Sequence, residues 1–173
     1  MDIEIGKMSD IDELERLYSS SIDYLTTNIN YPGWRKGVYP TREDAEKGIE
    51  EGGLFVLKIG DRIAGSVILS NKQDPAYTKV TWGIEADDSQ VIVIHTLVTH
   101  PDFIRQGISQ KLLNFTKEYA LSQNAKAIRL DVAAQNEPAI ALYEKYGYTY
   151  IETVDLGLPY EHLKCFRLYE LIL

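Results

Sequence analysis

The stretch "HPDFIRQGISQKLL" (His100–Leu113) contains the residue types of an anion-binding turn. It follows an apolar, β-type run that ends at Val98 or Thr99, and it leads into an amphipathic helical pattern that begins near Gly107. The N–H groups in the first turn of a helix have no partner within the helix, and the helix dipole makes that end partly positive. A phosphate could bind there, with Gly107 allowing close backbone approach and Arg105 adding a charge-assisted contact.

This turn is not specific by itself, because many helices begin near a glycine without binding a ligand. The stretch lacks the second glycine followed by Lys and Ser or Thr that defines a Walker A loop, and it does not match the dinucleotide-binding fingerprint. An ordinary helix start therefore remains the alternative interpretation.

A second group of residues, "NEPAIALYEKYGY", follows downstream. Asn136 is a favourable N-cap, Pro138 suits the first turn, and Gly147 is a typical helix stop. We expect a short helix here, separated from the anion-binding turn by one alternating strand, "KAIRLDV".

The elements that must position these residues form a mixed α/β pattern. Capping patterns at Ser9 and Thr41 predict two helices near the N-terminus, and Gly60-Asp61 predicts the turn of a hairpin. The strand, helix and strand around Gly107 predict two parallel strands with a right-handed crossover. We expect strands within residues 3–8, 54–59, 62–70, 90–98, 126–132, 148–154 and 162–173, and with less support within 76–84.

Composition narrows the class of protein. The length of 173 residues fits a single domain, residues 1–173. The net charge of −8 argues against nucleic-acid binding and would favour a cationic over an acidic acceptor. One cysteine, Cys165, gives no disulfide framework, and we expect it to be a small buried residue. An acidic start and no long apolar run predict a cytoplasmic protein without a membrane segment.

Three motifs in order resemble the GNAT superfamily of N-acetyltransferases. "IRQGIS" is similar to the family's Gln/Arg-x-x-Gly-x-Gly/Ala element, and "LVTHP" to its Leu-x-Val-x-Pro strand motif. Asn136, Ala139 and Tyr143 match its N-x-x-A-x-x-x-Y element. The similarity runs from Val91 to Tyr148. It implies a single GNAT-like domain, with a mixed, mostly antiparallel central sheet splayed between its fourth and fifth strands and flanked by about four helices.

The resemblance implies acetyl-CoA as the cofactor, used as a co-substrate. Its pantetheine would run along the backbone of Leu97, Val98 and Thr99, and Asn136 would contact the pantetheine arm. Its pyrophosphate would bind the N–H groups of Arg105, Gln106, Gly107, Ile108, Ser109 and Gln110. Two residues depart from the family's pattern: Ile104 replaces Gln or Arg, and Ser109 replaces Gly or Ala.

The resemblance also suggests catalytic roles for attack of an amine on a thioester. The N–H of Val98 would stabilise the oxyanion, and Tyr143 would protonate the thiolate. With pKa values of about 10 and 8.5, that transfer is uphill by roughly 2 kcal/mol. Two base candidates stay open, although His95 could instead be a hydrogen-bonded core histidine, and Asp131 a solvated strand residue or a cap for the next helix. His95 in "HTLVTH" matches a proton-relay histidine of arylalkylamine N-acetyltransferases, and Asp131 lies where ribosomal N-terminal-alanine acetyltransferases have a glutamate.

The expected acceptor is a primary amine on a small molecule or peptide. In this family the acceptor is bound between loops that correspond here to "NINYPGWRKGVYP" and "DLGLPYEHL", which makes Trp34, Tyr39 and Tyr160 candidate substrate-binding residues. The aromatics could equally pin these loops to the core. We assign no metal ligands and leave a homodimer open. The alternative functions are a non-catalytic acyl-CoA-binding or sensor module, and a phosphate-binding domain unrelated to CoA.

Overall fold

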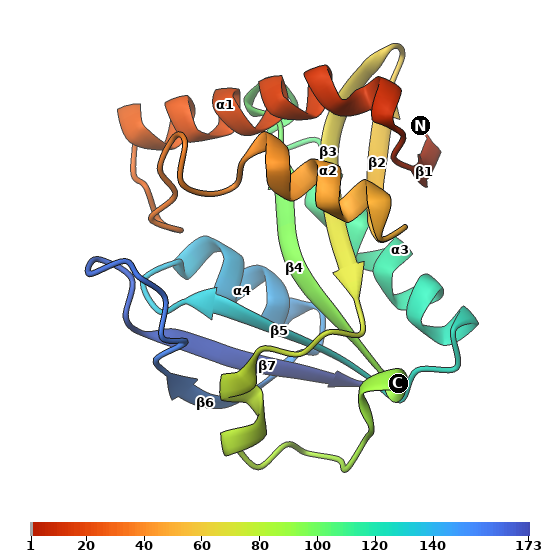
Figure 1. The fold of residues 1–173 in the computed structure, drawn as a ribbon, viewed down its shortest axis with the longest axis vertical. Coiled ribbons are helices and arrows are strands. Elements are labelled where there is room, and N and C mark those ends of the chain that lie inside the picture. Colours follow the sequence, from red (N-terminus) through yellow and green to blue (C-terminus); the bar gives the residue numbers. More distant parts are fainter. Residues whose placement is uncertain (1) are drawn as a thin grey trace. The chain divides into compact units, whose positions relative to one another are not determined.

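The computed structural model describes residues 2–173 (Figure 1). Its strands are β1 (Asp2–Ile5), β2 (Leu54–Ile59), β3 (Arg62–Ser70), β4 (Val91–Thr99), β5 (Ala127–Ala133), β6 (Thr149–Val154) and β7 (Phe166–Ile172). Its α-helices are α1 (Ile11–Thr27), α2 (Arg42–Glu50), α3 (Ile108–Ser122) and α4 (Glu137–Lys145). Short 3-10 helices are η1 (Met8–Asp10), η2 (Pro75–Lys79), η3 (Asp88–Gln90) and η4 (Pro101–Phe103).

The strands are hydrogen-bonded in the order β1-β2-β3-β4-β5-β7-β6. The β4–β5 pair is parallel, and the β1–β2, β2–β3, β5–β7 and β6–β7 pairs are antiparallel. This confirms the predicted mixed, mostly antiparallel sheet. The β4–β5 pairing joins Val91–Ile94 to Ala127–Leu130 and ends there although both strands continue, which agrees with the predicted splay.

The chain divides into two compact units. Unit 1 contains residues 2–30, 34–69 and 95–116, and unit 2 contains residues 31–33, 70–94 and 117–173. The two halves of β4 therefore belong to different units, with the division between Ile94 and His95.

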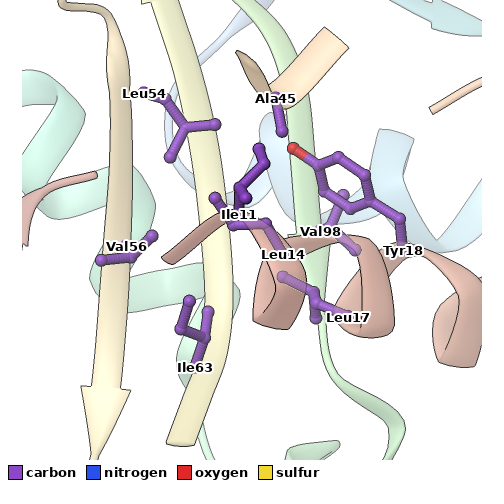
Figure 2. Packing of buried hydrophobic residues seen from close by; sticks show 9 residues of the cluster. All are labelled: Ile11, Leu14, Leu17, Tyr18, Ala45, Leu54, Val56, Ile63 and Val98. Atoms are coloured by element: carbon purple, nitrogen blue, oxygen red, sulfur yellow. The ribbon is translucent and has the colours of Figure 1, made fainter. Parts of the chain in front are cut away.

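Unit 1 is built on a core between two helices and the strands beneath them. Apolar residues recur along α1 at helical spacing, and they pack against side chains of β2 and β3 (Figure 2). Ala45 brings α2 into the same cluster, and Val98 brings in the end of β4. The buried residues of this cluster are Ile11, Leu14, Leu17, Tyr18, Ala45, Leu54, Val56, Ile63 and Val98.

The start of α3 covers the opposite face of β2 and β3. Gly65 of β3 lies opposite Leu57 in the strand register, and a Cβ at Gly65 would stand 2.7 Å from Ile108 of α3. The ring of Phe55 packs on Phe115 of α3, with ring centroids 4.8 Å apart. The absence of a side chain at Gly65 thus lets the first turn of α3 lie close to the sheet.

Unit 2 contains a buried ion pair beside its apolar core. Arg129 of β5 and Glu170 of β7 are register partners, and their side chains are 3% and 2% exposed. The Arg129 Nε donates to Glu170 Oε1 at 3.0 Å. Tyr77, Val91, Val93 and Leu168 form one apolar cluster of this unit.

Several local expectations are corrected by the structure. Residues 76–84 do not form a strand, because Asp74 accepts a hydrogen bond from the Ala76 N–H at 2.8 Å and Pro75 follows it, which together start η2. The first helix has Asp10, rather than Ser9, at its N-cap position. The Asp10 carboxylate instead accepts a hydrogen bond from the Lys7 N–H at 2.9 Å in the preceding turn, η1. Cys165 is exposed, because β7 begins only at Phe166.

Other local expectations are confirmed. Thr41 caps α2, and its hydroxyl accepts a hydrogen bond from the Asp44 N–H. Asn136 caps α4, with Pro138 in the first turn.

None of the helices formed by residues 2–173 is long and apolar enough to cross a membrane.

Candidate functional site

The turn between β4 and α3 bends the backbone through two left-handed positions. Arg105 has a φ of 65° and Gly107 a φ of 74°, and α3 begins immediately afterwards at Ile108. Glycine adopts this conformation without strain, whereas arginine does so at a cost. Lys111 makes the first helical bond, from its N–H to the Gly107 carbonyl oxygen at 3.0 Å. The Gln106 N–H donates to the Phe103 carbonyl oxygen at 3.3 Å. The N–H groups in the first turn of α3 are those that a helix leaves for a ligand.

The side chains of this turn differ in their environments. Arg105 and Gln110 are exposed, and the amide of Gln106 donates to the Asp102 carbonyl oxygen at 3.3 Å. The hydroxyls of Ser109 and Thr99 are hydrogen-bonded at 2.8 Å and so join the end of β4 to the first turn of α3. Ser109 thus has a structural partner at the position where the family prefers a smaller residue.

Hydroxyl groups of unit 1 bind the end of β4 at two positions along the strand. The Tyr39 hydroxyl donates to the His95 carbonyl oxygen at 3.1 Å and also contacts the Thr96 hydroxyl. The Ser21 hydroxyl of α1 donates to the Thr99 carbonyl oxygen at 3.1 Å. The side chain of His95 is exposed, although it lies on a strand whose preceding residues are buried. The backbone of Leu97 and Val98 therefore lies between two fixed points.

In unit 2, the carboxyl group of Asp131 forms a short hydrogen bond with Tyr77. The Tyr77 hydroxyl donates to Asp131 Oδ2 at 2.6 Å. Burial raises the pKa of Asp131 to about 6, the hydrogen bond from Tyr77 opposes this shift, and the charge of Asp74 adds to it. The residue as a whole keeps partial exposure to solvent. A carboxyl group of this kind is a stronger base than an ordinary aspartate.

Tyr143 is a buried residue of α4 in unit 2. Burial, and then the charge of Asp131, raise its pKa well above the ordinary value. Its ring meets that of Tyr148 edge to face, with ring centroids 5.6 Å apart. The phenol therefore stays protonated at neutral pH, and it is a weaker acid than a free tyrosine.

Asn136 performs the structural role predicted for it at the start of α4. Its Oδ1 accepts a hydrogen bond from the Ala139 N–H at 3.4 Å. The cap uses only the oxygen of the side-chain amide, whose NH₂ group carries two donors.

The three candidate acceptor-binding aromatics all pack on their own unit. Trp34 packs against the unit 1 core and meets Tyr39 edge to face at 6.2 Å. Tyr160 packs on the cluster of Ala133, Leu163 and Phe166 in unit 2. The loop around Tyr160 also contacts residues 31–33, through a 3.0 Å hydrogen bond between His162 Nε2 and the Gly33 carbonyl oxygen. Parts of the two predicted acceptor loops are thus joined through His162, a residue with no role predicted from the sequence.

Tyr77 is not among the candidate residues predicted from the sequence. It lies in the segment expected to be a strand, where a tyrosine is an ordinary sheet residue. The pair Asp74-Pro75 was the available signal, because this dipeptide favours the start of a turn or helix. The long-range hydrogen bond to Asp131 has no signal in the local sequence.

This chain is similar to curated proteins, and it spans only part of the length of each. Streptothricin acetyltransferase of Escherichia coli is 28% identical over 117 residues, which is 66% of this chain and 59% of that protein. The UPF0157 protein YqkA of Bacillus subtilis is 37% identical over 86 residues, which is 47% of this chain and 24% of that protein.

Solved structures are similar over almost the whole chain. A GNAT-family acetyltransferase of Streptococcus agalactiae is 18% identical, with a TM-score of 0.78, and the match covers 99% of this chain and 95% of that one. YncA of Salmonella typhimurium, solved with its cofactor acetyl-CoA, is 15% identical, with a TM-score of 0.72 and coverages of 99% and 93%. At these identities the likeness shows the fold.

The family model for the acetyltransferase (GNAT) family matches residues 14–148. This match covers both the turn before α3 and the helix that carries Tyr143. The chain therefore belongs to the GNAT family of acetyltransferases.

Proposed function

We propose that this chain transfers the acetyl group of acetyl-CoA to a primary amine, by direct attack in a ternary complex. The observation that carries the proposal is the backbone turn before α3. Its left-handed Arg105 and Gly107 direct the chain from β4 into the helix, whose first N–H groups have no helical partner. This geometry suits a pyrophosphate, and the family's co-substrate contains one.

The residues of the turn and of β4 fit this co-substrate in the proposed way. The N–H groups of Arg105 to Gln110 would bind the pyrophosphate. The backbone of Leu97, Val98 and Thr99 would bind the pantetheine, although the Thr99 carbonyl already accepts a bond from Ser21. Asn136 would donate its amide N–H groups to the pantetheine arm. When bound, acetyl-CoA supplies an activated acyl carbon and a thiolate leaving group.

The chemistry that remains for the chain is oxyanion stabilisation and two proton transfers. The amine nitrogen bonds to the thioester carbon, the carbon–sulfur bond breaks, one amine proton goes to a base, and the thiolate takes a proton. The Val98 N–H would stabilise the oxyanion. Tyr143 would donate a hydrogen bond, and then its proton, to the thiolate.

Of the two base candidates, Asp131 is supported by its environment. An alkyl ammonium has a pKa of about 10.4, and a base with a pKa of about 6 is closer to that value than an ordinary carboxyl group. His95 remains the second candidate, because its side chain is exposed on the strand. Two further parts of the proposal are that both units act as one acetyltransferase domain and that the protein works in the cytoplasm.

An acceptor screen that detects thiol release tests the function. The screen covers monoamines, diamines, N-terminal peptides, aminoglycosides and streptothricin, the last because a relative is a streptothricin acetyltransferase. We expect amine-dependent thiol release with at least one class. Binding of acetyl-CoA without release in any class would favour the non-catalytic binding module.

A second variant tests the role of Tyr143 in this reaction. Tyr143→Phe should lower kcat by about 10²-fold or more, which is the usual contribution of a positioned general acid. Acetyl-CoA affinity should be unchanged. Tyr148→Phe is the matched control, because it removes from the adjacent ring a buried hydroxyl that has no hydrogen-bond partner among residues 2–173. Equal kcat values in both variants would show that Tyr143 only packs.

A further inference from the structure

The segment between β3 and β4 is attached to β5 and β7 by a buried polar network in unit 2. Arg129 donates from Nη1 to Gln73 Oε1 at 2.8 Å and from Nη2 to the Ile84 carbonyl oxygen at 3.0 Å. Glu170 pairs with Arg129 and also accepts a hydrogen bond from the Gly83 N–H at 2.8 Å. Residues on both sides of η2 are thereby fixed to the sheet.

Two aromatic residues of the segment continue this network toward Asp131. The guanidinium of Arg129 lies over the Trp82 ring, 4.1 Å from its centroid. Trp82 in turn donates from Nε1 to the Tyr77 carbonyl oxygen at 2.9 Å. Tyr77 is 2% exposed, and its only polar side-chain atom is bound to Asp131 Oδ2 at 2.6 Å. The network therefore leads from a buried ion pair to one oxygen of a carboxyl group.

We propose that Tyr77 is a positioning residue for Asp131, and that the conformation of residues 73–84 places the Tyr77 hydroxyl against the Asp131 carboxyl group. This inference rests on the proposed function, in which Asp131 is the base. Tyr77 holds Oδ2, which leaves Oδ1 to accept the amine proton, directly or through water.

A purely structural role accounts less well for this arrangement. The ion pair and the Trp82 contact already attach the segment to the sheet. Burial and the nearby Asp74 both disfavour ionised Asp131, as its raised pKa shows. An apolar residue at position 131 would avoid that cost. An aspartate at this position is explained if the carboxyl group must ionise during the reaction while Tyr77 holds one of its oxygens.

The groups that act on Asp131 come from several elements. Tyr77 and Asp74 lie in and just before η2. Asp131 in turn acts on Tyr143 of α4, whose pKa its charge raises. Arg129, on the same strand, acts on Tyr77 and is itself paired with Glu170 of β7. Among these, only the Tyr77 hydrogen bond favours the ionised form of Asp131 directly.

The test is the variant Tyr77→Phe, which keeps the ring and removes the hydroxyl. Carbon NMR of the side-chain carboxyl groups measures the titration of Asp131. The Asp131 signal is assigned by its loss in Asp131→Asn. We expect the midpoint to rise on the order of one pH unit, since a hydrogen bond to the ionised form is lost. The acidic limb of the kcat profile should move by the same amount. Because Asp131 would then be about half ionised at pH 7, kcat at that pH should fall about twofold, with acetyl-CoA affinity unchanged.

Tyr150→Phe is the matched control, because its exposed hydroxyl bonds to Thr153 at 2.9 Å, elsewhere in the same unit. It should change neither the titration nor kcat. In the Asp131→Asn background, Tyr77→Phe should have no further effect on kcat. An unchanged Asp131 titration in a folded Tyr77→Phe protein would overturn the proposal.

The design separates this inference from the proposed function. If the wild-type protein transfers acetyl groups but the acidic limb does not move in Tyr77→Phe, the function stands and the positioning role is wrong. If no amine is acetylated while acetyl-CoA still binds, the proposed function is wrong, and the positioning role in catalysis falls with it.

Discussion

At the scale of single residues, the carboxyl group of Asp131 lies in an environment that disfavours its ionised form. Asp131 is held by Tyr77 and has a pKa of about 6, with burial as the main cause. A raised carboxyl pKa has two consequences. It makes the group a better base, and it makes the ionised form costly to the folded state.

This cost gives a stability prediction for Asp131→Asn. The folded-state pKa is above the unfolded value, so the favourable effect of the protonated form is fully present below pH 4. It is lost as pH rises through about 6. Asparagine can still accept the Tyr77 bond but does not ionise. The variant should therefore be more stable than wild type above pH 6, by up to about 3 kcal/mol.

Urea unfolding at pH 3.5, 5 and 7.5 measures this difference. The gain should be small at pH 3.5, grow through pH 5 and be complete at pH 7.5. A gain that is the same at all three pH values would mean that the effect is packing and not ionisation.

At the scale of elements, the path from β4 into α3 depends on one glycine. Gly107 is left-handed, and a Cβ there would meet Gln110 Oε1 at 3.6 Å, which is an ordinary contact. Substitution therefore changes the backbone preference rather than causing a clash. The N–H groups that would bind a pyrophosphate depend on this backbone.

Gly107→Ala should weaken acetyl-CoA binding about 10-fold, because alanine disfavours the left-handed turn by roughly 1–2 kcal/mol. Gly60→Ala is the matched control. Gly60 also has a positive φ, of 60°, and a Cβ there would meet nothing within 4 Å, but it lies in the β2–β3 turn. Thermal melts should show similar destabilisation of both variants.

Isothermal titration should show that only Gly107→Ala loses affinity for acetyl-CoA. Equal affinity in the two variants would mean that the turn before α3 does not bind the pyrophosphate.

At the scale of the whole molecule, we expect the net charge to favour cationic acceptors. A net charge of −8 attracts cations, and salt of physiological strength screens this attraction beyond about 8 Å. Any anionic co-substrate must then be held by a local arrangement such as the turn before α3.

If diamines are accepted, their KM should rise several-fold between about 20 and 300 mM salt, and more steeply than the KM of a monoamine of equal length. Steady-state kinetics at constant pH measures both slopes. Identical slopes would exclude a role of the overall charge in acceptor binding.

Much of the fold could be predicted from the sequence because its signals are local. The Gly60-Asp61 hairpin, the Thr41 and Asn136 caps and the parallel β4–β5 pair each follow from residues close together in the chain. Residues 76–84 resemble a strand in composition, because aromatic and β-branched residues are common both in strands and in segments that cover a sheet.

The sequence by itself determined the family and the residues of the turn before α3, since helix starts, glycines and capping residues act over a few positions. Only the tertiary structure decided the environment of those residues. In the folded chain Ser109 is hydrogen-bonded to Thr99, Tyr39 to β4 and Tyr77 to Asp131. Hydrogen bonds between residues distant in the chain, and the burial that shifts a pKa, depend on how the segments pack, and no local pattern records that packing.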